Sequence, residues 1–468
     1  MSLREADHRN FEFPEFLEEL NMTLKKFSRR RFLASTAAAA AVSAPYIRGV
    51  HAAGKLEVGF WDHWVPGAND VLTKMCQEWA AKEKVEIKID YIPSQGQKNL
   101  LTIAAESQAK AGHDMLAFPT WWPADKAKDL EPVDDIMKDL VAKNGAVSPL
   151  IEYLGKVGGH WVAIPATPGS QIKGPCARSD LFKQHVGLDI TKMYPAGAPP
   201  DKALSEAWTW DAFLAAAEKC HKAGFPFGIG LGQTADSVDT MGTLFGAYGA
   251  ELVDAKGNIT VNSDAVKQVL EYMKKLVPFL PPDVFAWDDS SNNKWLIAGK
   301  GALIMNPPSA WAVAKRDNVK VAEQLWTFPA PRGPKARVQP YLPYFWGIWK
   351  FSKNKAAAKS LMRHISEPSA VEKMVAASQG YDIPAFAKLN DFKTWAEEGP
   401  PKGTLYHYPP KPGQILQVSA YPAPPKIAAQ IYTQALATKL VAKYTQGGDS
   451  IDKVIGWAAA ELQGFMRV

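Results

Sequence analysis

The chain has 468 residues, which is too long for one ordinary hydrophobic core and suits two lobes. Its 47% hydrophobic and 22% charged residues are typical of a soluble globular protein. The net charge of +6, from 54 basic and 48 acidic residues, is too small and too dispersed to indicate a nucleic-acid-binding protein.

The N-terminal segment reads as an export signal. Residues 28–33 are Ser-Arg-Arg-Arg-Phe-Leu, which matches the twin-arginine pattern S-R-R-x-F-L, and an Ala-rich apolar run follows at 33–44. Small residues around Ala52 predict cleavage after that residue. Because the apolar run is too short to span a bilayer and no cysteine stands at the cleavage site, we expect residues 1–52 to be removed and the rest to be soluble in the periplasm.

Strands and helices alternate in the next part of the chain. The hydrophobic periodicity predicts strands at 56–61, 85–91 and 114–118, with helices at 68–82 and 99–110 between them. This βαβαβ pattern predicts a mostly parallel sheet with helices on both faces. Such sheets bind ligands in the loops after the carboxyl ends of their strands. Those loops hold His63 and Trp64, then Gln95, then Trp121, Trp122 and Asp125.

The chain beyond residue 160 predicts a crossing and a second lobe. Residues 163–171 are extended and interrupted by proline and glycine, which suits a lobe crossing. Further elements are predicted as helices at 210–223 and 263–277 and as short strands at 227–230 and 302–305. The region from residue 355 is mostly helical, except for a stretch at 399–425, rich in proline and tyrosine, that we expect to wrap the surface.

Seven short motifs follow one another in a fixed order along the mature chain. They are Trp61 at the end of the first strand, Gly112-His113-Asp114-Met115-Leu116, Gly159 to Pro165 (G-H-W-V-A-I-P), Thr209-Trp210-Asp211-Ala212-Phe213, Ala298 to Leu303 (A-G-K-G-A-L), Ser352 to Lys359 (S-K-N-K-A-A-A-K) and Gly447 to Val454 (G-G-D-S-I-D-K-V). Together they resemble the family 1 extracellular solute-binding proteins, the group that contains the maltose-binding proteins. The resemblance spans nearly the whole mature chain, with His113 where the family usually has proline.

The resemblance implies an α/β fold of the two-lobed periplasmic-binding-protein type, in which each lobe is a mostly parallel sheet flanked by helices and a hinge links the lobes. On this mapping the first lobe comprises 53–165 and 329–352, and the second comprises 170–325 and 356–468. Hinge crossings are expected at 166–169, 326–328 and 353–355. The resemblance also implies a monomer that captures a small solute between its lobes and delivers it to the permease of an ABC importer, without a cofactor or metal.

The 16 tryptophans suggest the class of solute, because sugar rings bind flat aromatic platforms with hydrogen-bonding groups around their edges. We therefore expect a carbohydrate. Carried over position by position, the resemblance assigns these residues to the ligand: Trp61, His63, Trp64, Trp121, Trp122, Asp125, Asp236, Trp287, Asp288, Asn306, Trp311, Tyr344, Trp346 and Tyr381. Ser237, Asp239 and Asp289 lie beside them in the sequence.

Several of these residues also have a purely structural interpretation. Trp61 stands at a strand end and suits a core position, and Asp288 and Asp289 could cap a helix that starts near Ser291. Where maltose-binding relatives place a stacking tryptophan, this chain has Ser309. A maltodextrin ligand is therefore not assumed.

Two other functions stay open. A polyamine or other cationic solute also suits an aromatic box with aspartates, and whether the cleft aspartates pair with lysine or arginine distinguishes this ligand from a sugar. A secreted carbohydrate-active enzyme could draw its acid pair from Asp236, Asp239, Asp288 and Asp289, although no known catalytic motif is present. The three cysteines, Cys76, Cys176 and Cys220, are expected to be buried thiols, with a Cys176–Cys220 disulfide as the alternative.

Overall fold

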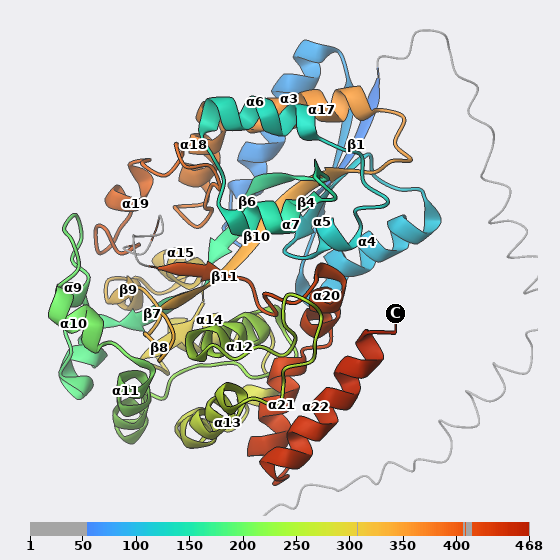
Figure 1. Cartoon of the computed structure of the whole chain (residues 1–468). Coiled ribbons are helices and arrows are strands. Elements are labelled where there is room, and N and C mark those ends of the chain that lie inside the picture. Colours follow the sequence, from blue (N-terminus) through green and yellow to red (C-terminus); the bar gives the residue numbers. More distant parts are fainter. Residues whose placement is uncertain (1–53, 307, 406–407, 409–413, 468) are drawn as a thin grey trace, which may run out of the picture. The chain divides into compact units, whose positions relative to one another are not determined.

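The computed structural model of the protein describes residues 54–306, 308–405, 408 and 414–467 (Figure 1). The predicted signal at 1–52, with its twin-arginine motif, lies outside these residues. Among the helices of the described part, none is both long enough and apolar enough to cross a membrane.

The first sheet has six strands in the order β11-β10-β3-β1-β2, with β6 also paired to β10. The strands are β1 (Lys55–Trp61), β2 (Glu86–Ile92), β3 (Met115–Pro119), β6 (Ile164–Ile172), β10 (Val338–Ile348) and β11 (Ile415–Gln417). β1 is parallel to β2 and β3, whereas β10 is antiparallel to β3 and β6. The predicted βαβαβ unit is therefore confirmed, and the loops after β1, β2 and β3 meet at one edge of the sheet.

Helices pack against the first sheet and against one another around it. In α3 (Ala68–Glu83) the residues Leu72, Met75, Cys76 and Trp79 are buried, which is the spacing of one helical face. The other elements of this region are η1 (Gln95–Gln97), α4 (Lys98–Ala109), α5 (Trp122–Asp125), α6 (Asp134–Asn144), α7 (Pro149–Gly155), β4 (Lys156–Val157), β5 (His160–Trp161), α17 (Lys355–Ile365) and α18 (Pro368–Ala377). Figure 1 shows α3, α6 and α17 side by side, and α3 and α6 both contact α17.

The second sheet has three strands, in the order β8 (Leu303–Met305), β7 (Pro175–Arg178), β9 (Leu325–Thr327). Both pairings of β7 are antiparallel, so the expectation of a mostly parallel second sheet was wrong. The reason lies in the chain path. β7 carries the chain away from the first sheet, whereas β9 leads back toward β10 of that sheet, so the two neighbours run in opposite directions.

Helices make up most of the second region. They are α8 (Ser179–Leu181), η2 (Phe182–Val186), α9 (Ile190–Met193), α10 (Lys202–Ala207), α11 (Trp210–Lys222), α12 (Ala235–Tyr248), α13 (Asp264–Leu276), η3 (Val277–Phe279), η4 (Val284–Ala286), α14 (Ser291–Ile297), α15 (Ser309–Asp317), α16 (Val319–Ala322), α19 (Thr394–Glu397), α20 (Pro425–Thr433), α21 (Leu436–Thr445) and α22 (Ile451–Phe465). The predicted cap of α11 is confirmed, because the Thr209 side chain accepts a hydrogen bond from the backbone N–H of Ala212.

Two long strands join the regions. β6 pairs with β10 at both of its ends, and the register shifts between Leu342 and Tyr344. Opposite this shift lies Gly169, whose φ is +89° and whose missing Cβ would lie 2.8 Å from the Tyr344 ring and 3.0 Å from the Trp61 ring. Glycine is required here by both the backbone and the space, within the predicted hinge crossing at 166–169.

The division of the chain between the lobes remains a prediction, and one part of it needs revision. The sequence assigned 356–468 to the second lobe after a crossing at 353–355. However, α17 contacts α3, α6 and β10, and α18 contacts α3 and β6. These contacts favour placing 355–377 with the first sheet, because the apolar faces of both helices are covered by its helices and strands.

Two local expectations also differ from the structure. Residues 227–230 form an isolated bridge from Gly228 to Ile304 instead of a strand. The stretch 399–425 was expected to lie on the surface, but its described part also reaches the core. Its strand β11 pairs with β10, and the side chains of Leu405 and Tyr408 are fully buried. Apolar side chains between the prolines anchor the stretch to the core.

All three cysteines are buried free thiols, as the sequence analysis favoured, and the Cys176–Cys220 disulfide is absent. Burial raises the pKa of each thiol to about 12.

We expect a thiol-reactive dye to label the purified mature protein slowly in its native state and to label three thiols per chain after denaturation without reductant, because burial shields the sulfur atoms. One thiol per denatured chain would instead indicate a disulfide and contradict the structure.

Candidate functional site

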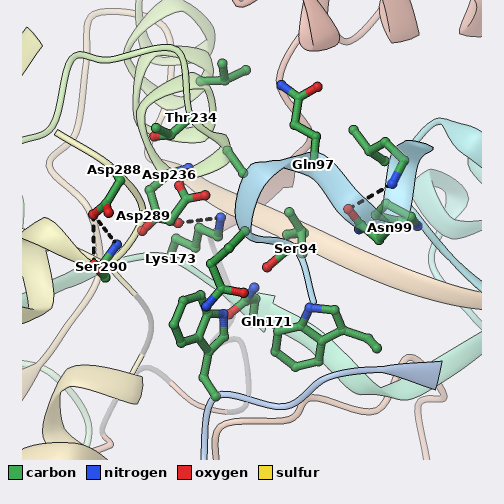
Figure 2. Close-up of a pocket in the computed structure, with 18 of the residues that line it drawn as sticks. Ser94, Gln97, Asn99, Gln171, Lys173, Thr234, Asp236, Asp288, Asp289 and Ser290 are labelled. Atoms are coloured by element: carbon green, nitrogen blue, oxygen red, sulfur yellow. Dashed lines mark hydrogen bonds and ion pairs between the residues drawn. The ribbon is translucent and has the colours of Figure 1, made fainter. Parts of the chain in front are cut away.

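A cavity of about 470 Å³ lies between segments that belong to both sheets (Figure 2). This volume is typical of a small-molecule site. Its described lining includes Trp61 and Trp64 after β1, Ser94 to Leu100 after β2, Trp122 after β3, Gln171 and Lys173 at the end of β6, Gln233 to Asp236 at the start of α12, and Asp288 to Ser290 before α14. Both lobes expected from the sequence therefore contribute side chains.

Lys173 is the central charge of the site. Its side chain is 3% exposed, and its Nζ donates to Asp236 Oδ1 at 2.8 Å and to Asp239 Oδ2 at 2.7 Å. Burial alone would lower the pKa of Lys173, but the two carboxylates outweigh burial, so its pKa is raised and it stays protonated. The pair ties the end of β6 to α12.

Asp236, Asp288 and Asp289, hereafter the acidic wall, present carboxylates to the cavity. Asp289 accepts the backbone N–H of Asp236 at 3.1 Å, within the first turn of α12, where the helix dipole favours a negative charge. Burial and the neighbouring Asp236 carboxylate nevertheless raise the pKa of Asp289 to about 6. Asp288 is exposed, and hydrogen bonds from Ser291 and Ser290 lower its pKa.

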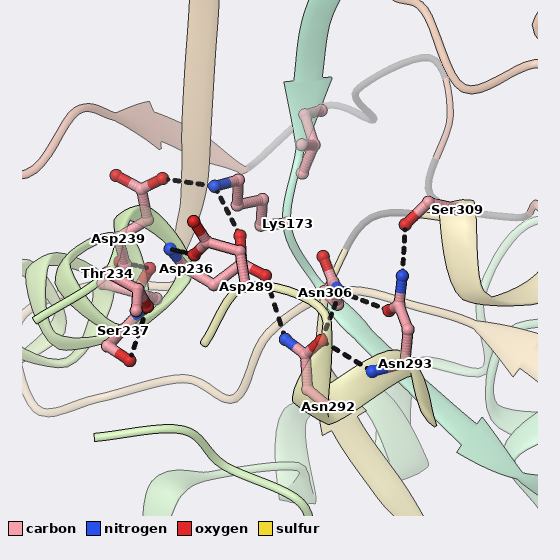
Figure 3. A network of polar contacts seen from close by, with 12 residues as sticks. Lys173, Thr234, Asp236, Ser237, Asp239, Asp289, Asn292, Asn293, Asn306 and Ser309 are labelled. Carbon is pink, nitrogen blue, oxygen red and sulfur yellow. Dashed lines mark hydrogen bonds and ion pairs between the residues drawn. The ribbon is translucent and has the colours of Figure 1, made fainter. Parts of the chain in front are cut away.

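A chain of amides continues from the acidic wall (Figure 3). Asn292 donates to Asp236 Oδ2 at 2.9 Å and accepts from Asn306 Nδ2 at 2.9 Å. Asn293 accepts a further hydrogen bond from Asn306 and donates to Ser309 Oγ at 3.1 Å. The chain fixes the orientations of Asn293, Asn306 and Ser309, all of which line the cavity.

A second group of polar side chains carries no charge. Ser94, Gln95, Gln97 and Asn99, hereafter the amide wall, come from the loop after β2 and the start of α4. In Figure 2, Lys173 and Gln171 lie between two groups of side chains. Gln97 and Asn99 are on one side of them, and the acidic wall is on the other. The two ends of the cavity therefore differ in charge.

Aromatic rings complete the lining. Trp61 stacks against Tyr381, with ring centroids 6.1 Å apart and planes at 19°, and contacts Tyr344 at 5.4 Å. Trp122 meets Tyr432 of α20 edge to face at 5.9 Å. These rings give the cavity apolar surfaces beside its polar walls.

Eight of the fourteen residues that the sequence assigned to the ligand line this cavity. They are Trp61, Trp64, Trp122, Asp236, Asp288, Asn306, Tyr344 and Tyr381. The structure brings them together from seven separate segments, and whether they contact a ligand remains a prediction. The predicted capping of α14 by Asp288 or Asp289 was wrong, because no side chain caps this helix and Asp288 instead accepts hydrogen bonds from the hydroxyl groups of Ser290 and Ser291.

The other six do not line it. Trp121 and Trp311 are fully buried, and their indole N–H groups donate to the carbonyls of Ser419 and Pro400 at 2.9 Å each. Trp287 packs on Trp295 and Trp346 packs on Phe60. Asp125 forms an ion pair with Lys126 at 2.8 Å. Packing and local pairing account for these five side chains.

His63, the sixth, supports the site from behind. Its Nδ1 accepts the backbone N–H of Val65 at 2.9 Å, so its Nε2 carries the proton that is shared with Asp382 at 3.0 Å. Its ring contacts Trp61 and Tyr381 edge-on, at 4.9 Å each. His63 thus holds two lining rings in place without reaching the cavity.

The sequence analysis missed Lys173, Gln171, Gln97, Asn99 and Tyr432. One signal for Lys173 was present, because it is the only charged residue between Trp161 and Ala177, a stretch that reads as buried. A charge in such a stretch needs partners. Nothing in the sequence pairs it with Asp236 and Asp239, since these lie more than 60 residues away.

Residues 66–372 match the family described as bacterial extracellular solute-binding protein. The chain belongs to this family. One relative of this chain is a probable ABC transporter-binding protein of Deinococcus radiodurans. The two are 25% identical over 348 residues, which cover 72% of this chain and 78% of the relative.

Two solved structures resemble the solute-binding protein in fold. One is a maltose-bound protein of T. maritima, 18% identical with a TM-score of 0.70, and the other is an ABC transporter solute-binding protein of Thermotoga lettingae bound with α-D-tagatose, 15% identical with a TM-score of 0.70. Each match covers 88% of this chain and 99% of the other. At these identities the likeness concerns the fold alone, and it confirms the α/β, two-lobed periplasmic-binding-protein architecture.

Membership of the family decides between two of the functions left open by the sequence. The protein is the extracellular solute-binding component of an ABC transporter, with a small solute and a permease as its partners, and it is not an enzyme. The interpretation as a secreted carbohydrate-active enzyme was therefore wrong. Of the aspartates that suggested it, Asp236 and Asp239 are ion-paired with Lys173, and Asp288 accepts hydrogen bonds from the hydroxyl groups of Ser290 and Ser291.

The raised pKa of Asp289 predicts a pH dependence of stability. Because the folded state binds a proton on Asp289 up to about pH 6 and the unfolded state only to about pH 4, the free energy of unfolding falls as the pH rises through this window. Between pH 5 and 7.5 the wild-type protein should lose about 1 kcal/mol relative to Asp289→Asn, measured by urea unfolding of the ligand-free protein.

The neighbouring variant Asp288→Asn serves as the control, because the pKa of Asp288 is lowered and its pH dependence lies at lower pH with the opposite sign. A difference between the wild type and Asp289→Asn that stays constant from pH 5 to 7.5 would show that Asp289 titrates normally.

Proposed function

We propose that the protein captures a carbohydrate, a mono- or oligosaccharide, between its two lobes and delivers it to the permease. The observation that carries the proposal is the combination of three tryptophans, Trp61, Trp64 and Trp122, with amides and carboxylates around one cavity. Aromatic faces pack on the C–H faces of a sugar ring, and amides and carboxylates bind its hydroxyl groups.

Unpartnered polar atoms in the lining support a ligand rich in hydroxyl groups. Among the described residues, Trp61 Nε1 has no acceptor and Gln171 Oε1 has no donor, although both side chains are buried. A hydroxyl group can accept from the indole and donate to the amide, because it has both capacities. A fully protonated polyamine offers donors only and leaves Trp61 Nε1 without a partner.

The charge distribution also argues against a polyamine. A linear polyamine carries a positive charge at each end, whereas the carboxylates that line the cavity all belong to the acidic wall and the amide wall is uncharged. Two of the three aspartates around Lys173, Asp236 and Asp239, are paired with its ammonium group. A chain with cationic ends therefore has a suitable partner at one end only.

Three further elements of the proposal concern the protein as a whole. The twin-arginine motif at 28–33 directs export to the periplasm, where residues 1–52 are removed. The mature protein acts as a monomer. Closure of the lobes around the sugar, about the segments β6 and β10, produces the form that the permease recognises.

Thermal unfolding of the purified mature protein with a panel of monosaccharides, disaccharides, oligosaccharides, polyols and polyamines tests the proposal. A sugar at about 100 times its dissociation constant should raise the free energy of unfolding by about 2.7 kcal/mol. Stabilisation by polyamines alone, or by no compound of the panel, would contradict a carbohydrate ligand.

A variant test localises the ligand. Trp64→Ala should weaken the binding of the best sugar by about tenfold to a hundredfold, because the half-buried indole lines the cavity and its loss removes a stacking surface. Trp457→Ala is the matched control, since Trp457 is also half-buried but lies on α22 and does not line the cavity. Equal dissociation constants for Trp64→Ala and the wild type, measured by calorimetry, would place the ligand elsewhere.

A further inference from the structure

The charges of the cavity do not balance. Lys173 is the only cation among the described residues that line it, and it faces three carboxylates, those of Asp236, Asp239 and Asp289. The Asp288 carboxylate also lines the cavity. Its ammonium group is bonded to Asp236 and Asp239. Among the described residues, no cation lies within ion-pairing distance of Asp289, although its carboxylate is largely buried beside Asp236, so the acidic wall retains uncompensated negative charge.

The excess charge is confined to one end of the site. The acidic wall comes from the start of α12 and the turn before α14, whereas the amide wall comes from the loop after β2 (Figure 2). Between the walls lies Gln171, which is 4% exposed and whose Oε1 accepts no hydrogen bond from the described residues. A ligand that suits all three features offers hydroxyl groups to the amide wall, a donor to Gln171 and one positive charge to the acidic wall.

We infer that the preferred ligand is an amino sugar, a polyhydroxylated ring or pair of rings with one protonated amine that binds at the acidic wall. The inference rests on the proposed carbohydrate function and names the class of sugar. An ammonium group placed near Asp289 gains charge-assisted hydrogen bonds in a partly desolvated site, where such bonds are stronger than in water. The rings Trp61 and Trp64 remain available for the apolar faces of the sugar.

Calorimetry at about pH 7 tests the inference with matched sugars: glucosamine against glucose and N-acetylglucosamine, galactosamine against galactose and N-acetylgalactosamine, and the disaccharide of glucosamine against cellobiose. In at least one set the amine should bind about tenfold more tightly than the parent sugar and the N-acetyl form, because only the amine carries a charge. Amines that bind no more tightly than their parent sugars in every set would overturn the inference.

The variant Asp289→Asn identifies the charge responsible. It keeps a side-chain oxygen that accepts the N–H of Asp236, and it should reduce the advantage of the amine over the parent sugar to about threefold or less. Asp125→Asn, outside the cavity, is the matched control and should leave the advantage unchanged. An advantage that survives in Asp289→Asn and in Asp288→Asn would also overturn the inference.

The possible failures are distinguishable. If neutral sugars bind as tightly as amino sugars, the proposed carbohydrate function stands and the inference fails. If no sugar binds and spermidine or putrescine does, the carbohydrate function itself fails and the inference fails with it.

Discussion

The buried ammonium group of Lys173 is the interaction on which the site depends. A charge so deeply buried is tolerated only when it is paired, and the pairing fixes its partners as firmly as it fixes the lysine. Lys173 stands at the end of β6, the strand that leaves the first sheet, and both partners lie on α12 of the second region. The ion pairs of Lys173 therefore link β6 to α12 of the second region and to the acidic wall of the cavity.

The polarity of the cavity follows from this arrangement. Asp236 binds Lys173 through one carboxylate oxygen and Asn292 through the other, so the amide chain that reaches Asn306 and Ser309 is oriented from the same centre. Asp289 joins it through the backbone of α12. His63, which is hydrogen-bonded to Asp382, contacts the lining rings of Trp61 and Tyr381 from outside the cavity and holds them in place. Supporting contacts of this kind preorganise the groups that meet a ligand.

The sequence predicted the elements better than their long-range contacts. The limits of β1, α3, β2, α4 and β3 follow from local periodicity and differ from the predicted ones by at most one residue. The direction of β7 and the packing of α17 depend on partners distant in the chain, which periodicity does not report. The same limit applies to the site. Of the tryptophans that the sequence assigned to the ligand, Trp61, Trp64 and Trp122 line the cavity. Trp121, Trp287, Trp311 and Trp346 are buried outside its lining, because an aromatic residue suits a core as well as a cleft.

The central claim is that one sugar binds in the cavity beside Lys173, with its charged end at Asp289. A crystal structure of the mature protein with the tightest-binding sugar tests this claim most directly. The account predicts a sugar ring in contact with Trp61, Trp64 or Trp122 and a ligand nitrogen within about 3 Å of a carboxylate oxygen of Asp288 or Asp289. A sugar bound outside this cavity, or one that meets the acidic wall with neutral groups only while its amine faces Gln97 and Asn99, would contradict it.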